Sequence, residues 1–317
     1  MNSKKSARQP GSRLGQHLTV MGVIDPGAKE PVYLVWHRSR WCPLACKVFP
    51  SVAEAESEAT LLREFSHPYI LRALGVEHPG CLLMPYLEGS TLSSLIDTAP
   101  RRWLGVSDAI RVALHIGAAL IHIHERGYLH LDIKPDNVIV GSDGRPVLFD
   151  FGTARKIRSP RPSRPIGTNA YIAPEECRLG KAGPAADVFS LGVTLYEMLT
   201  GDLPFGKSGG NTFRQLKAEA FDMAKFRSGV PAQLEQLVFA CLEKDPDFRP
   251  ELPDLMVSLN TFISRGPGMW PETFDPMRGT FDAHTASRCR RPKSIGALRR
   301  KRQARVLRPT AASQTVQ

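Results

Sequence analysis

One stretch constrains this chain more than any other: residues 128–137, followed by the Asp-Phe-Gly triplet at 150–152. The first run sets polar groups into an apolar frame, and these groups are His130, Asp132, Lys134 and Asn137. Residues 138–140 and 147–149 have the composition of short strands, and the glycine-flanked turn between them predicts a hairpin. Such a hairpin would bring Asn137 beside Asp150 at one end.

The chemistry of these side chains points to phosphate handling. The oxygens of Asn137 and Asp150 are hard ligands of the kind that Mg²⁺ and its bound phosphates take. Asp132 is then free to orient a hydroxyl group, and Lys134 can neutralise charge on a phosphoryl group during transfer. The alternative is a polar surface hairpin, but H-x-D-x-K-x-x-N followed by D-F-G is far more specific than either motif alone.

This combination resembles the catalytic loop and metal-binding turn of the protein kinase family. A second match is Gly167–Glu175, which follows the pattern G-T-x-x-Y-x-A-P-E. Small-molecule phosphotransferases share the two-carboxylate core but lack this pattern, which makes them the weaker alternative.

The resemblance extends over residues 14–263 and implies an α+β, bilobal protein-kinase-like fold. A small β-rich N-lobe would span residues 14–84 and a larger, mainly α-helical C-lobe residues 90–263. Residues 85–89 would form the hinge, and ATP would bind in the cleft between the lobes.

The resemblance also implies a reaction, the transfer of the γ-phosphoryl group of Mg-ATP to Ser or Thr hydroxyls of proteins, including the chain itself. Asp132 would orient the acceptor hydroxyl and accept its proton, and Lys134 would stabilise the transferring group. Asn137 and Asp150 would hold Mg²⁺ or Mn²⁺. The Lys-Pro-Asp-Asn sequence at 134–137 favours serine and threonine over tyrosine as acceptors.

In the N-lobe, the resemblance assigns the phosphate-binding lysine to Lys47. An isolated strand lysine is usually a solvated edge residue, but a helix-like segment at 51–65 follows it at the distance that the family uses. Glu58 on this helix would pair with Lys47. Glu54 and Glu56 are rivals for that role, and Glu58 is preferred for its spacing.

The main departure from the family lies in the glycine-rich loop, G-x-G-x-x-G-x-V. When Val32 is aligned with the last position of this pattern, only Gly27 matches a glycine, and Asp25 and Glu30 occupy the other two glycine positions. Backbone N–H groups reach phosphates there without a Cβ in the way, and carboxylates facing the phosphates would repel them. We expect weaker ATP binding, which motivates a second alternative, a pseudokinase scaffold.

The hinge residues are assigned by the same resemblance. Met84 would be the gatekeeper at the back of the adenine site. Pro85 has no N–H group but keeps the carbonyl that the adenine amino group needs. The N–H group of Leu87 would donate to the ring.

A second departure is Leu131, which stands where most regulated members carry an arginine just before the catalytic aspartate. That arginine binds a phosphate on the activation segment, which the resemblance assigns to residues 153–165 here, and leucine cannot. We therefore hypothesise that activity does not depend on a phosphate at Thr153, Ser159 or Ser163.

Further residues are expected to support the site from the C-lobe. Thr168 would bond to Asp132, Asp187 would hold the backbone of the catalytic loop, and Arg249 would pair with Glu175. A long helix is predicted from 107 to 126.

Helix caps are expected at Ser107 and Gly127. The histidines of this helix, His115, His122 and His124, fit packing or surface positions better than metal ligation, because no cluster of acids accompanies them.

The formal net charge of +11 is concentrated at one end of the chain. No Asp or Glu follows Asp282, and the segment from His284 onwards carries ten Lys and Arg residues. Residues 264–317 are typical of a linker and basic disordered tail, and residues 1–13 of a disordered basic N-terminus. An anionic partner for the tail, nucleic acid or a membrane surface, is the alternative to a merely solvated tail.

The remaining signals favour a cytoplasmic protein. The N-terminus has no apolar region of a secretory signal, and no run of about 18 uncharged apolar residues predicts a transmembrane segment. The six cysteines form no C-x-x-C pair and no zinc-like cluster, which indicates reduced thiols.

Overall fold

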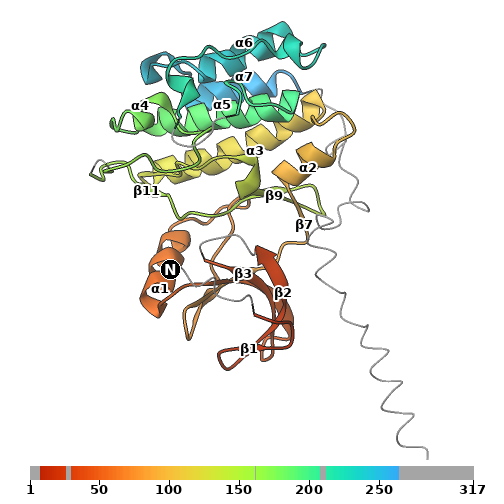
Figure 1. Ribbon diagram of the computed structural model, residues 1–317, viewed down its shortest axis with the longest axis vertical. Helices are drawn as coiled ribbons and strands as arrows, with labels where there is room; N and C mark the ends of the chain where they lie inside the picture. Colours follow the sequence, from red (N-terminus) through yellow and green to blue (C-terminus); the bar gives the residue numbers. More distant parts are fainter. Residues whose placement is uncertain (1–7, 26–29, 161, 208–211, 264–317) are drawn as a thin grey trace, which may run out of the picture.

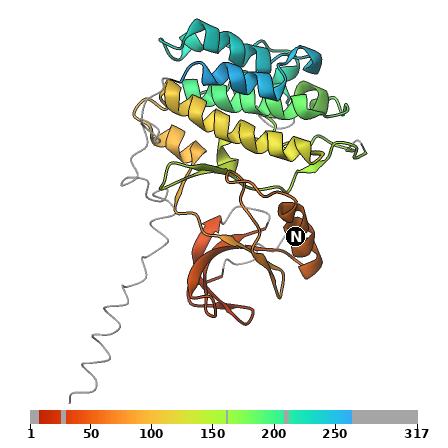
Figure 2. The same ribbon diagram turned by 180° about the vertical axis from the view of Figure 1, so that it is seen from behind.

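The computed structural model describes residues 8–25, 30–160, 162–207 and 212–263. These residues form two lobes, as Figures 1 and 2 show from opposite sides. The small lobe contains a curled sheet with one helix against it, and the large lobe is mainly helical. The predicted α+β, bilobal architecture is confirmed.

The small lobe is built on a six-stranded antiparallel sheet with the order β1-β2-β3-β4-β6-β5. Its strands are β1 (Arg13–Leu14), β2 (Leu18–Asp25), β3 (Val32–His37), β4 (Cys42–Val48), β5 (Gly75–Glu77) and β6 (Cys81–Pro85). Strand β4 contains Lys47, which the sequence analysis placed on a strand. Pairing also reaches back to Gly11, whose N–H group donates to Val20 O at 2.8 Å. The sheet therefore begins inside the segment predicted to be disordered.

The single helix of the small lobe, α1, runs from Val52 to Arg63. It begins here because the Ser51 side chain accepts a hydrogen bond from the Glu54 N–H group at 3.2 Å, an N-cap that satisfies one free donor of the first turn. Ala55, Ala59 and Leu62 are buried on one face, and α1 packs against β5 and β6. Glu54 is exposed, and the Glu56 side chain is 46% exposed.

The large lobe begins after β6. Its helices are α2 (Leu92–Thr98), α3 (Val106–Glu125), α4 (Pro174–Cys177), α5 (Pro184–Thr200), α6 (Ala232–Cys241) and α7 (Leu252–Asn260). Its strands are β7 (Gly89–Thr91), β8 (Tyr128–Leu129), β9 (Val138–Gly141), β10 (Pro146–Leu148) and β11 (Arg155–Lys156). Strands β9 and β10 form the predicted hairpin, with Leu148 opposite Val138. Short 3₁₀ turns at 135–137, 214–216, 223–225 and 246–248 complete the lobe.

Helix α3 differs from the sequence prediction at its start. Its N-cap residue is Gly105, which offers no side-chain bond, so Ser107 lies inside the first turn and is not the cap. At the other end Gly127 has φ +76° and donates its N–H group to His124 O, which fits the predicted glycine at the helix end.

Helix α3 is the one helix within the described ranges that is long and apolar enough to cross a membrane. More than half of its apolar window is buried in the protein. It packs against α5 and α7, so we interpret it as the central helix of the large lobe.

Two apolar clusters hold the fold together. One fills the small lobe on one face of its sheet and includes Leu18, Tyr33, Val35 and Leu83. The other runs from the cleft-facing side of that sheet through α1 and into the helices of the large lobe. This second cluster is continuous between the lobes, so it connects the elements that carry the polar residues described below.

The described residues include only part of what was predicted for the chain ends and the thiols. The predicted linker and basic tail, residues 264–317, lie outside the described residues. Five of the six cysteines are described, and each is a free thiol. No group of three or more His, Cys, Asp or Glu side chains in the described ranges could hold a metal ion.

Candidate active site

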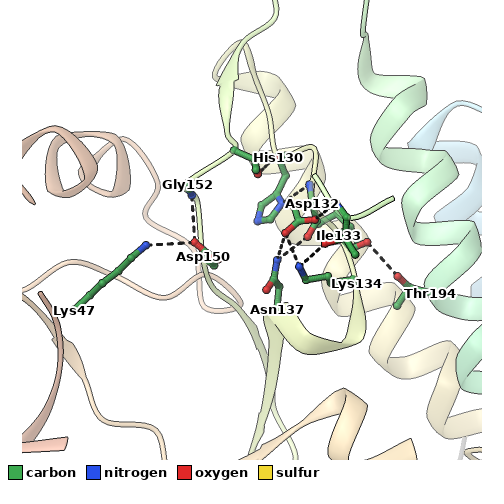
Figure 3. A network of polar contacts seen from close by, with 11 residues as sticks. Lys47, His130, Asp132, Ile133, Lys134, Asn137, Asp150, Gly152 and Thr194 are labelled. Atoms are coloured by element: carbon green, nitrogen blue, oxygen red, sulfur yellow. Dashed lines mark hydrogen bonds and ion pairs between the residues drawn. The ribbon is translucent and has the colours of Figure 1, made fainter. Parts of the chain in front are cut away.

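Asp132 lies at the centre of a buried polar network on the cleft side of the large lobe (Figure 3). Its Oδ2 atom accepts from Lys134 Nζ and from Asn137 Nδ2, both at 2.8 Å. Its Oδ1 atom accepts from the Thr168 N–H group at 2.8 Å. Burial alone would raise the pKa of Asp132, but the hydrogen bonds and the charge of Lys134 outweigh it and hold the pKa below its usual range. The carboxylate therefore stays ionised.

The backbone before Asp132 is held from below by Asp187, a fully buried residue of α5. The N–H groups of His130 and Leu131 donate to its two carboxylate oxygens at 3.0 and 2.8 Å. The Nε2 atom of His124 lies 2.8 Å from Asp187 Oδ2. Leu131 has φ +64°, an unfavourable left-handed conformation that these bonds maintain. The predicted brace by Asp187 is confirmed.

Gly167 allows the opposite side of this network to close. It has φ +105°, and a Cβ atom there would lie 2.5 Å from the carbonyl oxygen of Leu131. Only glycine fits this approach. The next residue, Thr168, is thereby placed to donate to Asp132 and to accept from Lys134 Nζ through its hydroxyl group. The predicted contact of Thr168 is confirmed.

Asn137 and Asp150 lie at the same end of the β9–β10 hairpin, because the Phe149 N–H group donates to Asn137 O at 3.0 Å. Asn137 uses its amide nitrogen for both bonds to Asp132, so its carbonyl oxygen is the atom that it can offer to a cation. The Asp150 side chain is 44% exposed toward the cleft. Carboxylate and amide oxygens of this kind are ligands that a divalent metal ion takes.

Lys47 reaches into the cleft from β4. Its Nζ atom lies 2.9 and 3.1 Å from the two carboxylate oxygens of Glu58 on α1, and 3.4 Å from Asp150 Oδ1. Burial would lower the pKa of Lys47, but the charges of Asp150, Glu58 and, to a smaller degree, Glu30 outweigh it and raise the pKa. The predicted contact with Glu58 is therefore confirmed over its rivals.

The remaining residues with a predicted nucleotide role lie on the sheet of the small lobe and in the segment that follows it. Val32 pairs with Lys47 across β3 and β4. Met84 is buried on β6, and Pro85 ends that strand. Leu87 is half-buried and packs against the cluster shared by the lobes. The predicted phosphate contact at Gly27 lies outside the described residues. The nucleotide roles of these residues stay predictions.

The sequence that builds this site is similar to the sequences of known proteins. Residues 18–259 match a family model described as the protein kinase domain. The chain belongs to the protein kinase family.

Several bacterial kinases are similar to this one. PrkC of Bacillus subtilis is 28% identical over 262 residues, which cover 78% of this chain and 40% of PrkC. A probable serine/threonine-protein kinase of Clostridium perfringens, CPE1738, is 29% identical over 252 residues, or 74% of this chain and 36% of that protein. PkaB of Streptomyces coelicolor is 31% identical over 238 residues, or 71% and 56%. This kinase thus matches about half or less of the length of these relatives.

The activation segment of this kinase is attached to the catalytic loop at its start. The Thr153 hydroxyl group donates to His130 O at 2.8 Å. Strand β11 then pairs with β8, with Arg155 opposite Leu129. Leu131, in the position of the usual arginine, is buried and offers no cation to a phosphate.

The segment Gly167–Glu175, which follows the activation segment, is held by an ion pair. Arg249 donates to both carboxylate oxygens of Glu175 at 2.8 Å and to Ala185 O at 2.8 Å. The predicted Arg249–Glu175 pair is thus confirmed. Tyr171 additionally donates its hydroxyl group to Glu197 on α5, a contact that the sequence did not predict.

Two features of the site were missed by sequence reasoning. Phe151 packs between Phe65, after α1, and His130, with ring centroids 5.3 and 4.8 Å away. This stack joins α1 to the catalytic loop, and no local pattern signals it. The bond from His124 to Asp187 was also missed, because the two residues are 63 positions apart. A histidine in the last turn of an apolar helix is the only available signal.

Proposed function

We propose that this protein is a serine/threonine protein kinase that transfers the γ-phosphoryl group of Mg-ATP to Ser or Thr hydroxyls of proteins, including itself. The observation that carries the proposal is the ionised Asp132 carboxylate, held by Lys134, Asn137 and Thr168. The bacterial kinases described above support the acceptor class, since their names describe serine/threonine-protein kinases. We propose the cytoplasm as its compartment.

Asp132 acts on the acceptor. A carboxylate with a lowered pKa is a weak base, so its main contribution is to orient the hydroxyl group and to receive its proton late in the transfer. Lys134 lies 2.8 Å from the same carboxylate, where its charge can stabilise the phosphoryl group in transit. Lys134 donates to Thr168 as well as to Asp132. This bond joins the catalytic loop to the segment around Thr168, which would receive the substrate.

Lys47, Asn137 and Asp150 act on the nucleotide. Lys47 would contact the phosphates, and Glu58 keeps it charged and oriented. Asn137 and Asp150 would hold the metal ion, which supplies neutralisation of the phosphate charge when bound. Met84, Pro85 and Leu87 would border the adenine ring.

The experiment is phosphate incorporation from labelled Mg-ATP into the protein itself and into a generic basic protein. We expect label on serine and threonine with the wild type and an approximately 1,000-fold loss with Asp132→Asn. Asp143→Asn is the matched control, because Asp143 is an exposed aspartate of the β9–β10 turn. Chelation of Mg²⁺ should abolish incorporation.

Absence of label from folded wild-type protein with either Mg²⁺ or Mn²⁺ would overturn the proposal. Equal label from the wild type and Asp132→Asn would overturn the role of Asp132. Label on tyrosine alone would overturn the acceptor class, which rests on residues 134–137.

A further inference from the structure

The turn between β3 and β4 exposes a tryptophan at the end of the small lobe. Trp41 is 77% exposed, the highest value among the exposed large apolar side chains of the described residues. It follows Arg38, Ser39 and Arg40, all exposed as well. The apolar surface of such an exposed indole ring stays in contact with water unless a binding partner covers it.

Trp41 also has an unfavourable backbone. Its φ angle is +55°, in the left-handed region that bulky residues avoid. Its N–H group donates to His37 O at 2.8 Å, which closes the turn, but glycine or asparagine would close it with less strain. The ring gains only an edge contact with Trp36, with centroids 6.5 Å apart. Neither burial nor backbone preference explains a tryptophan at this position.

The neighbouring surface is basic. By the sheet register, Arg13 on β1 pairs with Thr19, Thr19 with Trp36, and Trp36 with Pro43. Directly paired residues of an antiparallel sheet share a face, so Arg13 lies on the same face as Trp36.

The segments that build this surface, residues 8–24 and 32–53, contain no Asp or Glu. We call Arg13, Trp36, Arg38, Arg40 and Trp41 the arginine–tryptophan patch. The Arg38 guanidinium is anchored by a bond to Gln16 O at 3.1 Å, which fixes the turn against the start of β2.

We infer that the arginine–tryptophan patch binds the surface of an anionic phospholipid membrane. An indole ring is most stable at the level of the lipid headgroups, where its apolar body and polar N–H group are both satisfied. Arginine pairs with lipid phosphates in a fixed, two-pronged geometry. The patch offers both groups on one rigid hairpin, which would place the small lobe against the bilayer and keep the large lobe in the aqueous phase.

Single-stranded nucleic acid fits the same charge but not the same ring geometry. Base stacking needs open aromatic faces along a basic groove. Here the planes of Trp36 and Trp41 meet at 82°, so one ring covers part of the other instead of forming two parallel platforms. The tryptophan is also at a hairpin turn, a position suited to entering an interface.

The test measures whether Trp41 enters lipid. Full-length protein carrying Trp270→Phe is mixed with vesicles of phosphatidylglycerol and phosphatidylcholine in equal parts, with bromine on the acyl chains as a quencher. We expect quenched tryptophan fluorescence, and loss of most of that quenching when Trp41→Phe is added. Trp36 and Trp103 are present in both proteins, so the quenching that is lost with Trp41→Phe reports lipid contact by Trp41 itself. Vesicle binding through the basic tail alone does not produce this difference.

Partitioning gives a second readout. The double variant Arg38→Ala/Arg40→Ala should bind these vesicles about 25-fold more weakly, from about fivefold per arginine at an anionic surface. The matched control is Arg101→Ala/Lys207→Ala, which removes two exposed cations from the large lobe. Vesicles of phosphatidylcholine alone should not bind through the patch. Phosphorylation of a soluble substrate should be unchanged by Trp41→Phe, so this test is independent of the proposed activity.

Three results would overturn the inference. The first is equal quenching with and without Trp41. The second is Trp41-dependent binding of a single-stranded oligonucleotide without lipid quenching. The third is a melting temperature of Trp41→Asn below that of the wild type. Asparagine suits a left-handed backbone, so we expect this variant to melt no lower than the wild type while it loses lipid quenching. A lower melting temperature would make Trp41 a structural residue.

Discussion

The two sides of the cleft are built in different ways. On the acceptor side, Asp132 is 7% exposed and Asp187 beneath it is fully buried, and the bonds that hold them come from residues of the large lobe. On the nucleotide side, Lys47 comes from β4, Glu58 from α1 and Asp150 from the large lobe. The Asp150 side chain is 44% exposed.

This difference separates a preformed half of the site from an assembled half. The acceptor side keeps its geometry as long as the large lobe is folded. The nucleotide side exists only when α1 and the two lobes are correctly placed. The departures from the family pattern at Asp25 and Glu30 fall on the assembled side, where approach of the nucleotide and lobe closure can compensate for them.

The largest effect is expected from removing Asp187, which holds the backbone of the preformed side. Asp187→Ala would leave the N–H groups of His130 and Leu131 buried without their acceptor. We expect a loss of about 3–5 kcal/mol in the free energy of unfolding and a melting temperature about 10 °C lower. Activity should fall even at temperatures where the variant is folded, because Asp132 follows this backbone directly.

Asp187→Asn is the companion variant. It keeps the side-chain shape and one acceptor oxygen, so its loss of stability should be clearly smaller. Equal melting temperatures for Asp187→Ala and the wild type, measured by thermal denaturation, would show that the loop is not held from below.

The second prediction concerns the assembled side. Glu58→Gln removes the charge that pairs with Lys47 but leaves the 3.4 Å contact with Asp150. We expect kcat/KM for ATP to fall about tenfold, mainly through KM, with little change in melting temperature. Glu56→Gln is the matched control, since the Glu56 side chain is 46% exposed on the same helix and pairs with Arg63 at 3.3 Å, away from Lys47. A similar loss in both variants would contradict the specific role of Glu58.

These two sides also differed in how far the sequence predicted them. Asp132, Lys134 and Asn137 of the acceptor side are close together in the chain, so the pattern around Asp132 specified their chemistry directly. Thr168 and Asp187 are far from them in sequence and were predicted from the family resemblance. Lys47 and Glu58 are 11 positions apart, and spacing was sufficient to choose Glu58 over Glu54 and Glu56.

What the sequence did not predict depends on packing between distant segments. The stack of Phe65 on Phe151 joins residues from different lobes, and periodicity carries no signal for it. The cap of α3 was misplaced because Ser107 is a good cap by residue type, whereas the backbone turns into the helix at Gly105.

A third prediction uses a carboxyl group near the preformed side. Glu176 on α4 is buried, and its Oε1 atom has no partner among the described residues. Burial, with smaller effects from Asp187 and Glu175, raises the pKa of Glu176 to about 8. The folded protein therefore binds a proton that the unfolded chain releases near its ordinary pKa, so stability is lost as the pH rises through the folded pKa.

Glu176→Gln carries no titrating proton, and its stability should not fall in this way. We expect its melting temperature to exceed that of the wild type by several degrees at about pH 9, and by much less at about pH 5. Thermal denaturation across this range measures the difference. A constant difference at every pH would mean that folding does not raise the pKa of Glu176.

The smallest expected effect tests whether the preformed side needs a phosphate to form. The triple variant Thr153→Ala, Ser159→Ala and Ser163→Ala removes the candidate phosphate acceptors of the activation segment. Because Leu131 provides no cation for a phosphate, and Asp187 and Lys134 already fix the loop, we expect kcat to change by no more than about twofold. The small loss that we do expect comes from the Thr153 hydroxyl group, which bonds to His130 O at 2.8 Å. Ser159→Ala/Ser163→Ala, which keeps that bond, should match the wild type. If the triple variant stays folded but loses activity, and the double variant loses it too, a phosphate is required and the acceptor side is not preformed.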